Sequence, residues 1–151
     1  MMHGMSAFKT LIVEDNAAFR RSLSELLRAS YPTMVVAQAD NISDAWKKIV
    51  EIEPRLAFVD IRLGEENGLD LTRDIVQFYP RVMVAVITGY NIPEYRQAAF
   101  QNGAHFFIPK ESAGSSVILT LVDSIRSGRP PQWALGGGSI NPANRIPPWK
   151  K

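Results

Sequence analysis

The chain has 151 residues, no cysteine and a formal net charge of +2 at pH 7. This length suits one domain with a sizeable core, and the absence of cysteine excludes a disulfide framework and a thiolate metal site. No apolar run approaches the roughly 18 residues that span a membrane, and the N-terminal residues lack the apolar core of a signal peptide. We therefore predict a cytoplasmic protein with no membrane partner, and the small charge gives no reason to expect bound nucleic acid.

Short apolar runs alternate with segments of helical periodicity, which predicts βαβ units and a parallel sheet in an α/β domain. We expect strands near residues 10–13, 34–37, 56–59, 83–87 and 106–109, and helices near residues 16–29, 43–52, 68–79, 93–101 and 112–127. Asn16 is a candidate N-cap of the first helix, and Gly68 is expected to begin the third. Right-handed crossovers would place helices on both faces of the sheet.

The last part of the chain has a different composition. Residues 129–151 contain paired prolines and three consecutive glycines, without apolar periodicity. This composition predicts a flexible Pro/Gly-rich tail or linker. We therefore expect one domain over residues 8–128, preceded by an N-terminal extension of residues 1–7.

Polar side chains follow four of the predicted strands. Glu14 and Asp15 follow the first strand, Asp60 the third, Thr88 the fourth and Lys110 the fifth. The site of an open α/β sheet lies outside the carboxyl ends of its strands, so we expect these groups to converge. Carboxylates can hold Mg²⁺ together with phosphate oxygens. A carboxylate can also attack a phosphoryl group, which makes Asp60 the candidate nucleophile.

These motifs resemble the receiver domain of two-component response regulators over about residues 8–128. The matching features are Glu14-Asp15, Asp60, Gly68 eight residues later, Thr88-Gly89 and Lys110. The resemblance implies a flavodoxin-like, doubly wound, five-stranded parallel sheet of strand order 2-1-3-4-5 with five helices. It also implies a signalling switch, not a metabolic enzyme, in which Asp60 accepts a phosphoryl group from a histidine kinase or phosphotransfer protein. That reaction would need Mg²⁺ or Mn²⁺.

The resemblance implies a ligand set for the metal. Asp15 and Asp60 would bind the ion directly, and Glu14 would act mostly through water. The main-chain carbonyl of Arg62 would complete the protein's share of the ligands.

The resemblance also assigns the remaining site residues. Thr88 and Lys110 would hold the phosphoryl group, and Arg62 and Tyr90, each two positions beyond a site residue, would tune the lifetime of the phosphate. Phe107 falls where the family carries its rotating aromatic switch, so Thr88 and Phe107 would form the switch. A protein partner or an output domain would meet the face made by the fourth helix, fifth strand and fifth helix.

The chain departs from the family pattern at several positions. Lys110 is followed by Glu111 where the family usually has proline, so a trans peptide bond is expected. Lys-Glu-Ser at residues 110–112 resembles the branch that usually carries a C-terminal helix-turn-helix domain. Gly64 replaces the usual proline four residues after Asp60, which predicts a looser loop. Whether the natural chain continues into such a domain, and whether it forms a homodimer, stays open.

Two alternatives remain. An aspartyl-phosphate hydrolase of the haloacid dehalogenase type also uses a strand-end Asp and Mg²⁺, but its second acid would fall at Arg62, which cannot act as an acid at neutral pH. A degenerate receiver that only binds proteins would lack Asp60, Thr88 or Lys110, and the chain has all three. His105 is expected to be an ordinary edge residue.

Overall fold

The computed structural model describes residues 7–128, so the predicted tail and most of the N-terminal extension lie outside the described residues. The strands are β1 (Lys9–Val13), β2 (Val35–Ala39), β3 (Leu56–Val59), β4 (Arg62–Leu63), β5 (Glu66–Asn67), β6 (Met83–Thr88) and β7 (Phe106–Pro109). The helices are α1 (Ala17–Ser30), α2 (Ile42–Ile52), α3 (Gly68–Phe78), α4 (Pro93–Gln101) and α5 (Ser115–Ser127), with a 3₁₀ turn at Lys110–Ser112. Within the described residues, no helix is long and apolar enough to cross a membrane.

The main sheet has five parallel strands in the order β2-β1-β3-β6-β7. This order confirms the predicted 2-1-3-4-5 arrangement, with β6 and β7 as the fourth and fifth strands of the sheet. Val13 pairs with Val59, and Val59 pairs with Val86. The ends of the three central strands are therefore aligned, so the residues that follow them meet at one edge.

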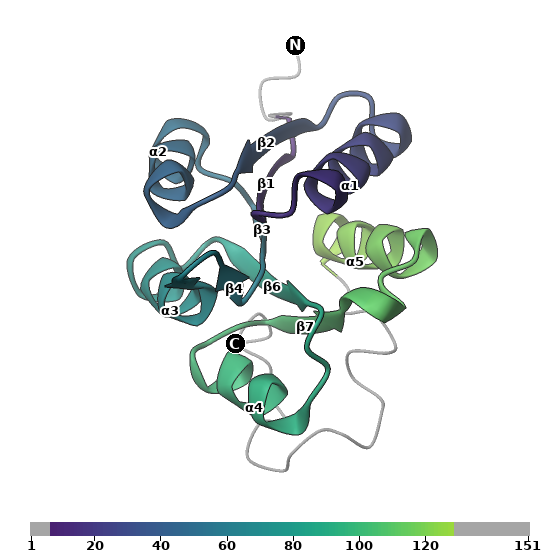
Figure 1. Ribbon diagram of the computed structural model, residues 1–151. Helices are drawn as coiled ribbons and strands as arrows, with labels where there is room; N and C mark the ends of the chain where they lie inside the picture. Colours follow the sequence, from purple (N-terminus) through teal and green to yellow (C-terminus); the bar gives the residue numbers. More distant parts are fainter. Residues whose placement is uncertain (1–6, 129–151) are drawn as a thin grey trace.

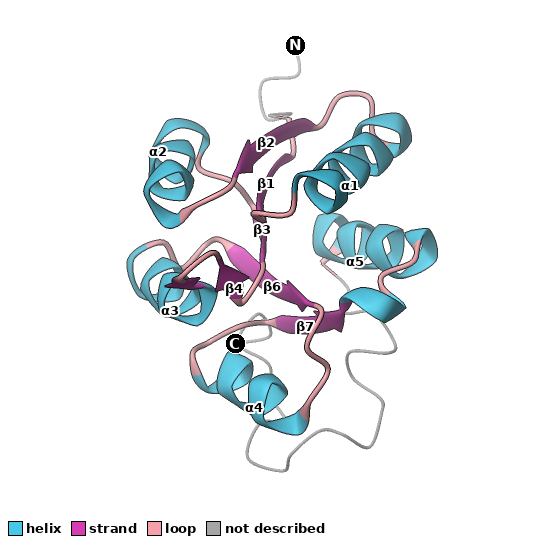
Figure 2. Cartoon of the chain, viewed as in Figure 1, coloured by secondary structure: helices cyan, strands magenta, loops and turns pink. Residues whose placement is uncertain are grey.

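Helices cover both faces of this sheet, as Figure 1 and Figure 2 show. On one face, Ile12 and Phe58 pack in a cluster with Leu27 of α1 and Leu121 of α5. A second apolar cluster fills the other face, beneath α2, α3 and α4. Because both faces are buried, the strands appear in the sequence as continuous apolar runs without polar alternation.

Asparagine side chains begin three of the helices. The side chains of Asn16, Asn41 and Asn67 accept hydrogen bonds from main-chain N–H groups in the first turns of α1, α2 and α3. Such caps satisfy donors that have no partner within the helix. The prediction that α5 begins near Ser112 was wrong, because residues 110–112 form the 3₁₀ turn and α5 begins at Ser115.

Two apolar residues that continue the helical spacing of apolar positions in α2 and α3 are exposed. Val50 is 63% exposed and Phe78 is 64% exposed. Ile49 fills the core position in its turn of α2, and its sequence neighbour Val50 therefore points about 100° away around the helix. At the end of α3, Tyr79 packs against Trp46, with ring centroids 6.0 Å apart, and Phe78 is left in solvent.

The short hairpin of β4 and β5 was not predicted. Arg62 pairs with Asn67 and Leu63 with Glu66 in antiparallel register, just after Asp60. Gly64 occupies the turn with φ of +64°, a conformation that glycine adopts at little cost. The hairpin lies between the end of β3 and the start of α3, directly beside the edge where the site residues meet.

His105 extends the pairing of β6 with β7 through its side chain. Its Nδ1 accepts a hydrogen bond from the main-chain N–H of Val84 at 3.0 Å, and its own N–H donates to the Val84 carbonyl at 2.9 Å. Burial lowers the pKa of His105 from 6.5 to about 4. The residue is therefore a neutral acceptor that belongs to the sheet, and its role is structural.

Acid should weaken the stabilisation that neutral His105 gives to the folded protein. Because the folded-state pKa of His105 is depressed, the stabilisation is present above pH 6.5 and is lost as the pH falls toward about 4. We expect a loss of about 2–3 kcal/mol in the free energy of unfolding from this group. The variant His105→Asn keeps an acceptor but does not titrate. Urea unfolding at pH 7 and pH 4.5 should show that the free energy of unfolding falls less in the variant than in the wild type. Equal losses in the two proteins would contradict the assignment of His105 as the titrating group.

Candidate functional site at the carboxyl edge of the sheet

Main-chain hydrogen bonds fix the two central acids at the end of the sheet. The N–H of Glu14 donates to the carbonyl of Ala39 at 2.9 Å, and the N–H of Asp60 donates to the carbonyl of Val13 at 3.0 Å. Each bond continues the strand pairing by one residue beyond β1 and β3. Both side chains are therefore held on rigid backbone next to each other.

Three carboxylates converge at this edge. One oxygen atom from each of Glu14, Asp15 and Asp60 lies within 4.8 Å of the others. Glu14 is 1% exposed and Asp60 is 5% exposed, whereas Asp15 lies at the open side of the cluster. The predicted convergence of these acids is what the structure shows.

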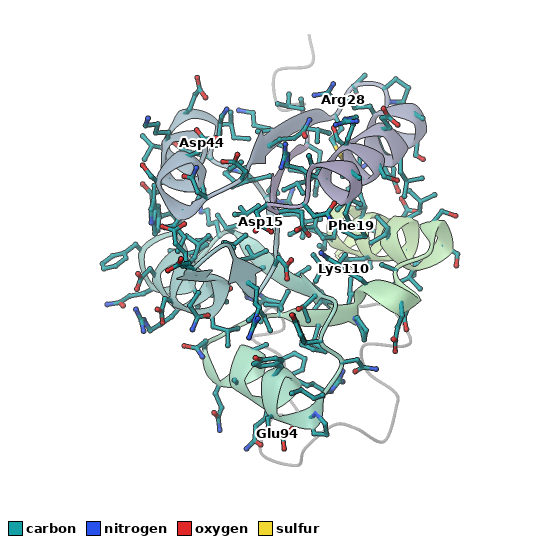
Figure 3. The ribbon with its side chains drawn as sticks, viewed as in Figure 1. Asp15, Phe19, Arg28, Asp44, Glu94 and Lys110 are labelled. Carbon is teal, nitrogen blue, oxygen red and sulfur yellow. The ribbon has the colours of Figure 1, made fainter. Side chains whose placement is uncertain are left out.

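Lys110 reaches into this cluster from the end of β7. Its Nζ lies 2.7 Å from Glu14 Oε1 and 3.1 Å from Asp60 Oδ2. The ammonium group also lies 4.6 Å from the centroid of the Phe19 ring, and Figure 3 shows Asp15, Phe19 and Lys110 gathered at the centre of the molecule. Burial lowers the pKa of Lys110, but the hydrogen bonds and charges of the two carboxylates outweigh it and raise the pKa overall.

The negative charges of the cluster outnumber its positive charge. Burial raises the pKa of Glu14 from its ordinary value of 4.5 to about 7, and the negative charge of Asp60 adds to this effect. Lys110 and the main-chain N–H of Asn16 act in the opposite direction. One lysine therefore only partly compensates the buried carboxylates, so the cluster can accept further positive charge.

The oxygen atoms of the cluster fit a hard divalent cation. Asp60 Oδ1 is buried and has no hydrogen-bond partner among the described residues. Buried polar atoms are rarely left unpaired, and an unpaired carboxylate oxygen beside two further acids is a donor set that Mg²⁺ or Mn²⁺ accepts. Glu14 has less capacity to bind directly, because both of its oxygens are engaged: Oε2 accepts from the N–H of Asn16 at 2.9 Å, and Oε1 lies 2.7 Å from Lys110 Nζ.

Thr88 ends β6 and is fully buried. Its hydroxyl oxygen accepts a hydrogen bond from the N–H of Tyr90 at 3.3 Å. The guanidinium of Arg62 lies over the Tyr90 ring, 4.9 Å from its centroid, and Tyr90 meets the edge of Tyr95 at 5.7 Å. Arg62 and Tyr90 therefore form a stacked pair with each other, and their side chains are not part of the carboxylate cluster.

Phe107 lies on β7, where it pairs with Val86 of β6. Its ring is only 4% exposed and belongs to the apolar cluster beneath α4. The guanidinium of Arg96, from α4, lies 5.7 Å from the centroid of this ring. The aromatic ring already points inward in this structure.

Residues 10–122 match the model of the family described as the response regulator receiver domain. The chain belongs to this receiver domain family. Its fold agrees with that of a CheY-like receiver domain protein from Methanospirillum hungatei, with a TM-score of 0.72 at 23% identity over 81% of this chain and 96% of that chain. Membership places this receiver domain in two-component signalling.

Relatives of this receiver domain include a transcriptional activator and an enzyme. It is 29% identical over 121 residues to the DNA-binding transcriptional activator DevR/DosR of Mycobacterium tuberculosis, covering 80% of this chain and 55% of the relative. It is 32% identical over 120 residues to a protein-glutamate methylesterase/protein-glutamine glutaminase of Methanococcus maripaludis, covering 78% of this chain and 33% of the relative. The chain therefore spans about half or less of the length of these relatives.

A further solved structure with the same fold holds a modified aspartic acid. A response regulator from Burkholderia pseudomallei, crystallised with a phosphorylated aspartic acid, a calcium ion and citrate, is 25% identical to this receiver domain. The TM-score is 0.65, over 80% of this chain and 72% of that chain.

Two glycines support the site of this receiver domain in ways that the sequence did not fully reveal. Gly68 was recognised by its spacing from Asp60, but its role is steric, because it packs against the Asp60 carbonyl. Gly64 was expected to loosen its loop, yet its N–H donates to Asp15 Oδ2 at 2.8 Å. Sequence spacing could not have indicated this bond, because it depends on the unpredicted hairpin.

A hollow of about 1180 Å³ lies at the other end of the sheet, lined by residues that include Lys9, Tyr31 and Arg55. None of the clustered carboxylates lines it. Sites in open α/β sheets lie at the carboxyl ends of the strands, so this hollow lies away from the edge where a site is expected.

Proposed function

We propose that this receiver domain accepts a phosphoryl group on Asp60 from a histidine kinase or a phosphotransfer protein, in a reaction that needs Mg²⁺ or Mn²⁺. The observation that carries this proposal is the buried Asp60 carboxylate, with one oxygen held by Lys110 and the other without a partner among the described residues. A carboxylate is a competent nucleophile toward phosphorus. The phosphorylated aspartic acid in the Burkholderia pseudomallei relative supports the same chemistry here.

The metal would be held by Asp15, Asp60 and the main-chain carbonyl of Arg62, with Glu14 acting mostly through water. When bound, the ion would neutralise charge on the phosphoryl oxygens. The assignment of Asp15 as a direct ligand is supported by its open position in the cluster. The indirect role of Glu14 is supported by its existing bonds to Lys110 and to the Asn16 N–H.

The other residues of the site would hold the transferred group. Lys110 already contacts Asp60 and can shift to a phosphoryl oxygen as a point charge. The Thr88 hydroxyl, at the end of the neighbouring strand, can donate to another oxygen. Arg62 and Tyr90, stacked on each other at the surface, would limit the access of water and so tune the lifetime of the phosphate.

Replacement of Asp15 should weaken Mg²⁺ binding more than replacement of Glu14. We expect Asp15→Ala to lower the Mg²⁺ affinity by about tenfold or more, because replacing even a residue that only orients a metal ligand lowers the affinity by about that much. Glu14→Ala should cost less, and the exposed Glu51→Ala on α2 should change little. Calorimetric Mg²⁺ titration of the three variants measures the order, and equal or reversed losses for Asp15 and Glu14 would contradict it.

We propose that the output face is formed by α4, β7 and α5, with Thr88 and Phe107 as the switch. A rotating aromatic switch would turn the Phe107 ring inward on phosphorylation, but the ring is already buried. Phosphorylation should therefore draw Thr88 toward the phosphoryl group and repack Arg96 of α4 around a ring that stays inside. Structures with and without a phosphoryl mimic test this, and an unmoved Thr88 loop and α4 in both would contradict it.

The number of phosphoryl groups transferred per chain separates this function from that of a hydrolase of the haloacid dehalogenase type. Such a hydrolase needs a second acid where this chain has Arg62, whose guanidinium stacks on Tyr90. We expect Mg²⁺ and a small phosphodonor to label the protein at most once per chain, with only slow release of phosphate. Rapid, sustained turnover of a phosphate ester would instead favour a hydrolase.

We infer that residues 8–128 form the receiver unit of a cytoplasmic regulator and that residues 129–151 serve as a linker or tail. The DNA-binding regulators among the relatives support an output domain of that kind in the natural protein. The length of the natural chain would test for an output domain. A homodimer through the output face is a second arrangement, and the mass of the protein in solution would test it.

A further inference from the structure

The hairpin that follows Asp60 is tied to the rest of the domain at two points. At its turn, the N–H of Gly64 donates to Asp15 Oδ2 at 2.8 Å. On its second strand, Glu66 Oε1 accepts from the N–H of Ile42 at 2.9 Å. Ile42 is the first residue of α2, so the hairpin connects the start of that helix to a carboxylate of the metal cluster.

The Gly64 bond depends on the residue type. Gly64 has φ of +64°, which an L residue with a side chain adopts only at a cost. It also supplies an N–H group, which the proline that usually occupies this position in the family cannot do. The substitution that was expected to loosen the loop therefore provides a donor for Asp15.

The Glu66 bond is well placed to hold the hairpin. The first N–H groups of a helix have no partner within the helix, and a carboxylate near them is favoured by the helix dipole. Glu66 is exposed, so this bond to Ile42 is what orients its side chain. Glu65, its neighbour in the turn, is also exposed, but its side chain makes no hydrogen bond to any described residue.

We propose that Glu66 is a positioning residue for the divalent cation, which it serves by anchoring the hairpin so that the Gly64 N–H holds Asp15. The inference rests on the proposed function, because it takes Asp15 as a metal ligand. Asp15 is exposed, so its carboxylate would otherwise sample several rotamers. One oxygen fixed by Gly64 leaves the other available to the cluster, and such outer partners govern the affinity of a metal site.

The test compares Mg²⁺ affinity among four proteins: the wild type, Glu66→Ala, Glu66→Gln and Glu65→Ala. Glu65→Ala removes the same charge from the adjacent residue of the same hairpin, so it reports the purely electrostatic effect. We expect Glu66→Ala to bind Mg²⁺ about tenfold more weakly than Glu65→Ala. Glu66→Gln should recover most of that loss, because its amide oxygen can still accept from Ile42.

A second readout needs no metal. In the metal-free protein, hydrogen exchange at the Gly64 amide should be slow in the wild type and in Glu65→Ala, and clearly faster in Glu66→Ala. Equal affinities of Glu66→Ala and Glu65→Ala, equal exchange at Gly64, or no recovery by glutamine would each overturn the inference while leaving the proposed function intact. A wild type that binds no Mg²⁺ would overturn both.

Discussion

Replacement of Gly68 by alanine is expected to destabilise the protein by about 3 kcal/mol. A Cβ atom at this position would overlap the carbonyl oxygen of Asp60 and lie 2.9 Å from its carbonyl carbon and 3.1 Å from Val59 Cγ1. The obstacle is main chain, which cannot move aside as a flexible side chain would. The N–H of Gly68 also donates to the Ile61 carbonyl at 2.6 Å, so the start of α3 is held against the Asp60 loop.

Urea unfolding measures the effect, and Gly89→Ala provides the control. A Cβ at Gly89 would meet nothing within 4 Å, and its φ is not positive. The control should therefore lie within about 1 kcal/mol of the wild type. We also expect Gly68→Ala to lose phosphorylation, because any relaxation moves Asp60. A variant as stable as the control would contradict the close packing described for this position.

Much of the fold could be predicted because its signals are local. Continuous apolar runs such as Leu56–Val59 indicated strands buried on both faces, and Asn16 indicated the start of the first helix. The convergence of Glu14, Asp15 and Asp60 followed from one rule about the ends of parallel strands. Nothing beyond strand order and strand ends was needed to bring these carboxylates together.

The remainder depended on contacts between distant residues. Val50 and Phe78 fit a helical stripe, but whether a stripe position is buried depends on which neighbouring elements reach it. The β4–β5 hairpin has only two residues in each strand, too few for a period to be recognised. The bond from Gly64 to Asp15 joins residues 49 positions apart and required that hairpin.

The pairing of Lys110 with two carboxylates could likewise not be predicted from a sequence pattern. The sequence placed Lys110 at the right edge, but the ion pairs with Glu14 and Asp60 depend on side-chain conformations that only the packed site fixes. The raised pKa of Glu14 is a product of that same packing.

The substitution Asp60→Asn is expected to abolish phosphorylation completely. Asparagine has nearly the same shape as aspartate and can still accept a hydrogen bond from Lys110, so the fold should be retained. Its amide cannot form an acyl phosphate, because the nucleophilic carboxylate oxygen is gone. Asp74→Asn on α3, a half-buried carboxylate that pairs with Arg73 and lies outside the cluster, is the matched control, and it should be labelled like the wild type.

Mass spectrometry of the phosphorylated protein tests the central claim most directly. After incubation with Mg²⁺ and a small phosphodonor, we predict one phosphoryl group per chain, located on the peptide that contains Asp60. The label should be absent when the metal is chelated and absent from Asp60→Asn. Full labelling of Asp60→Asn, or a label located on another residue of the wild type, would contradict the assignment of Asp60 as the phosphoryl acceptor.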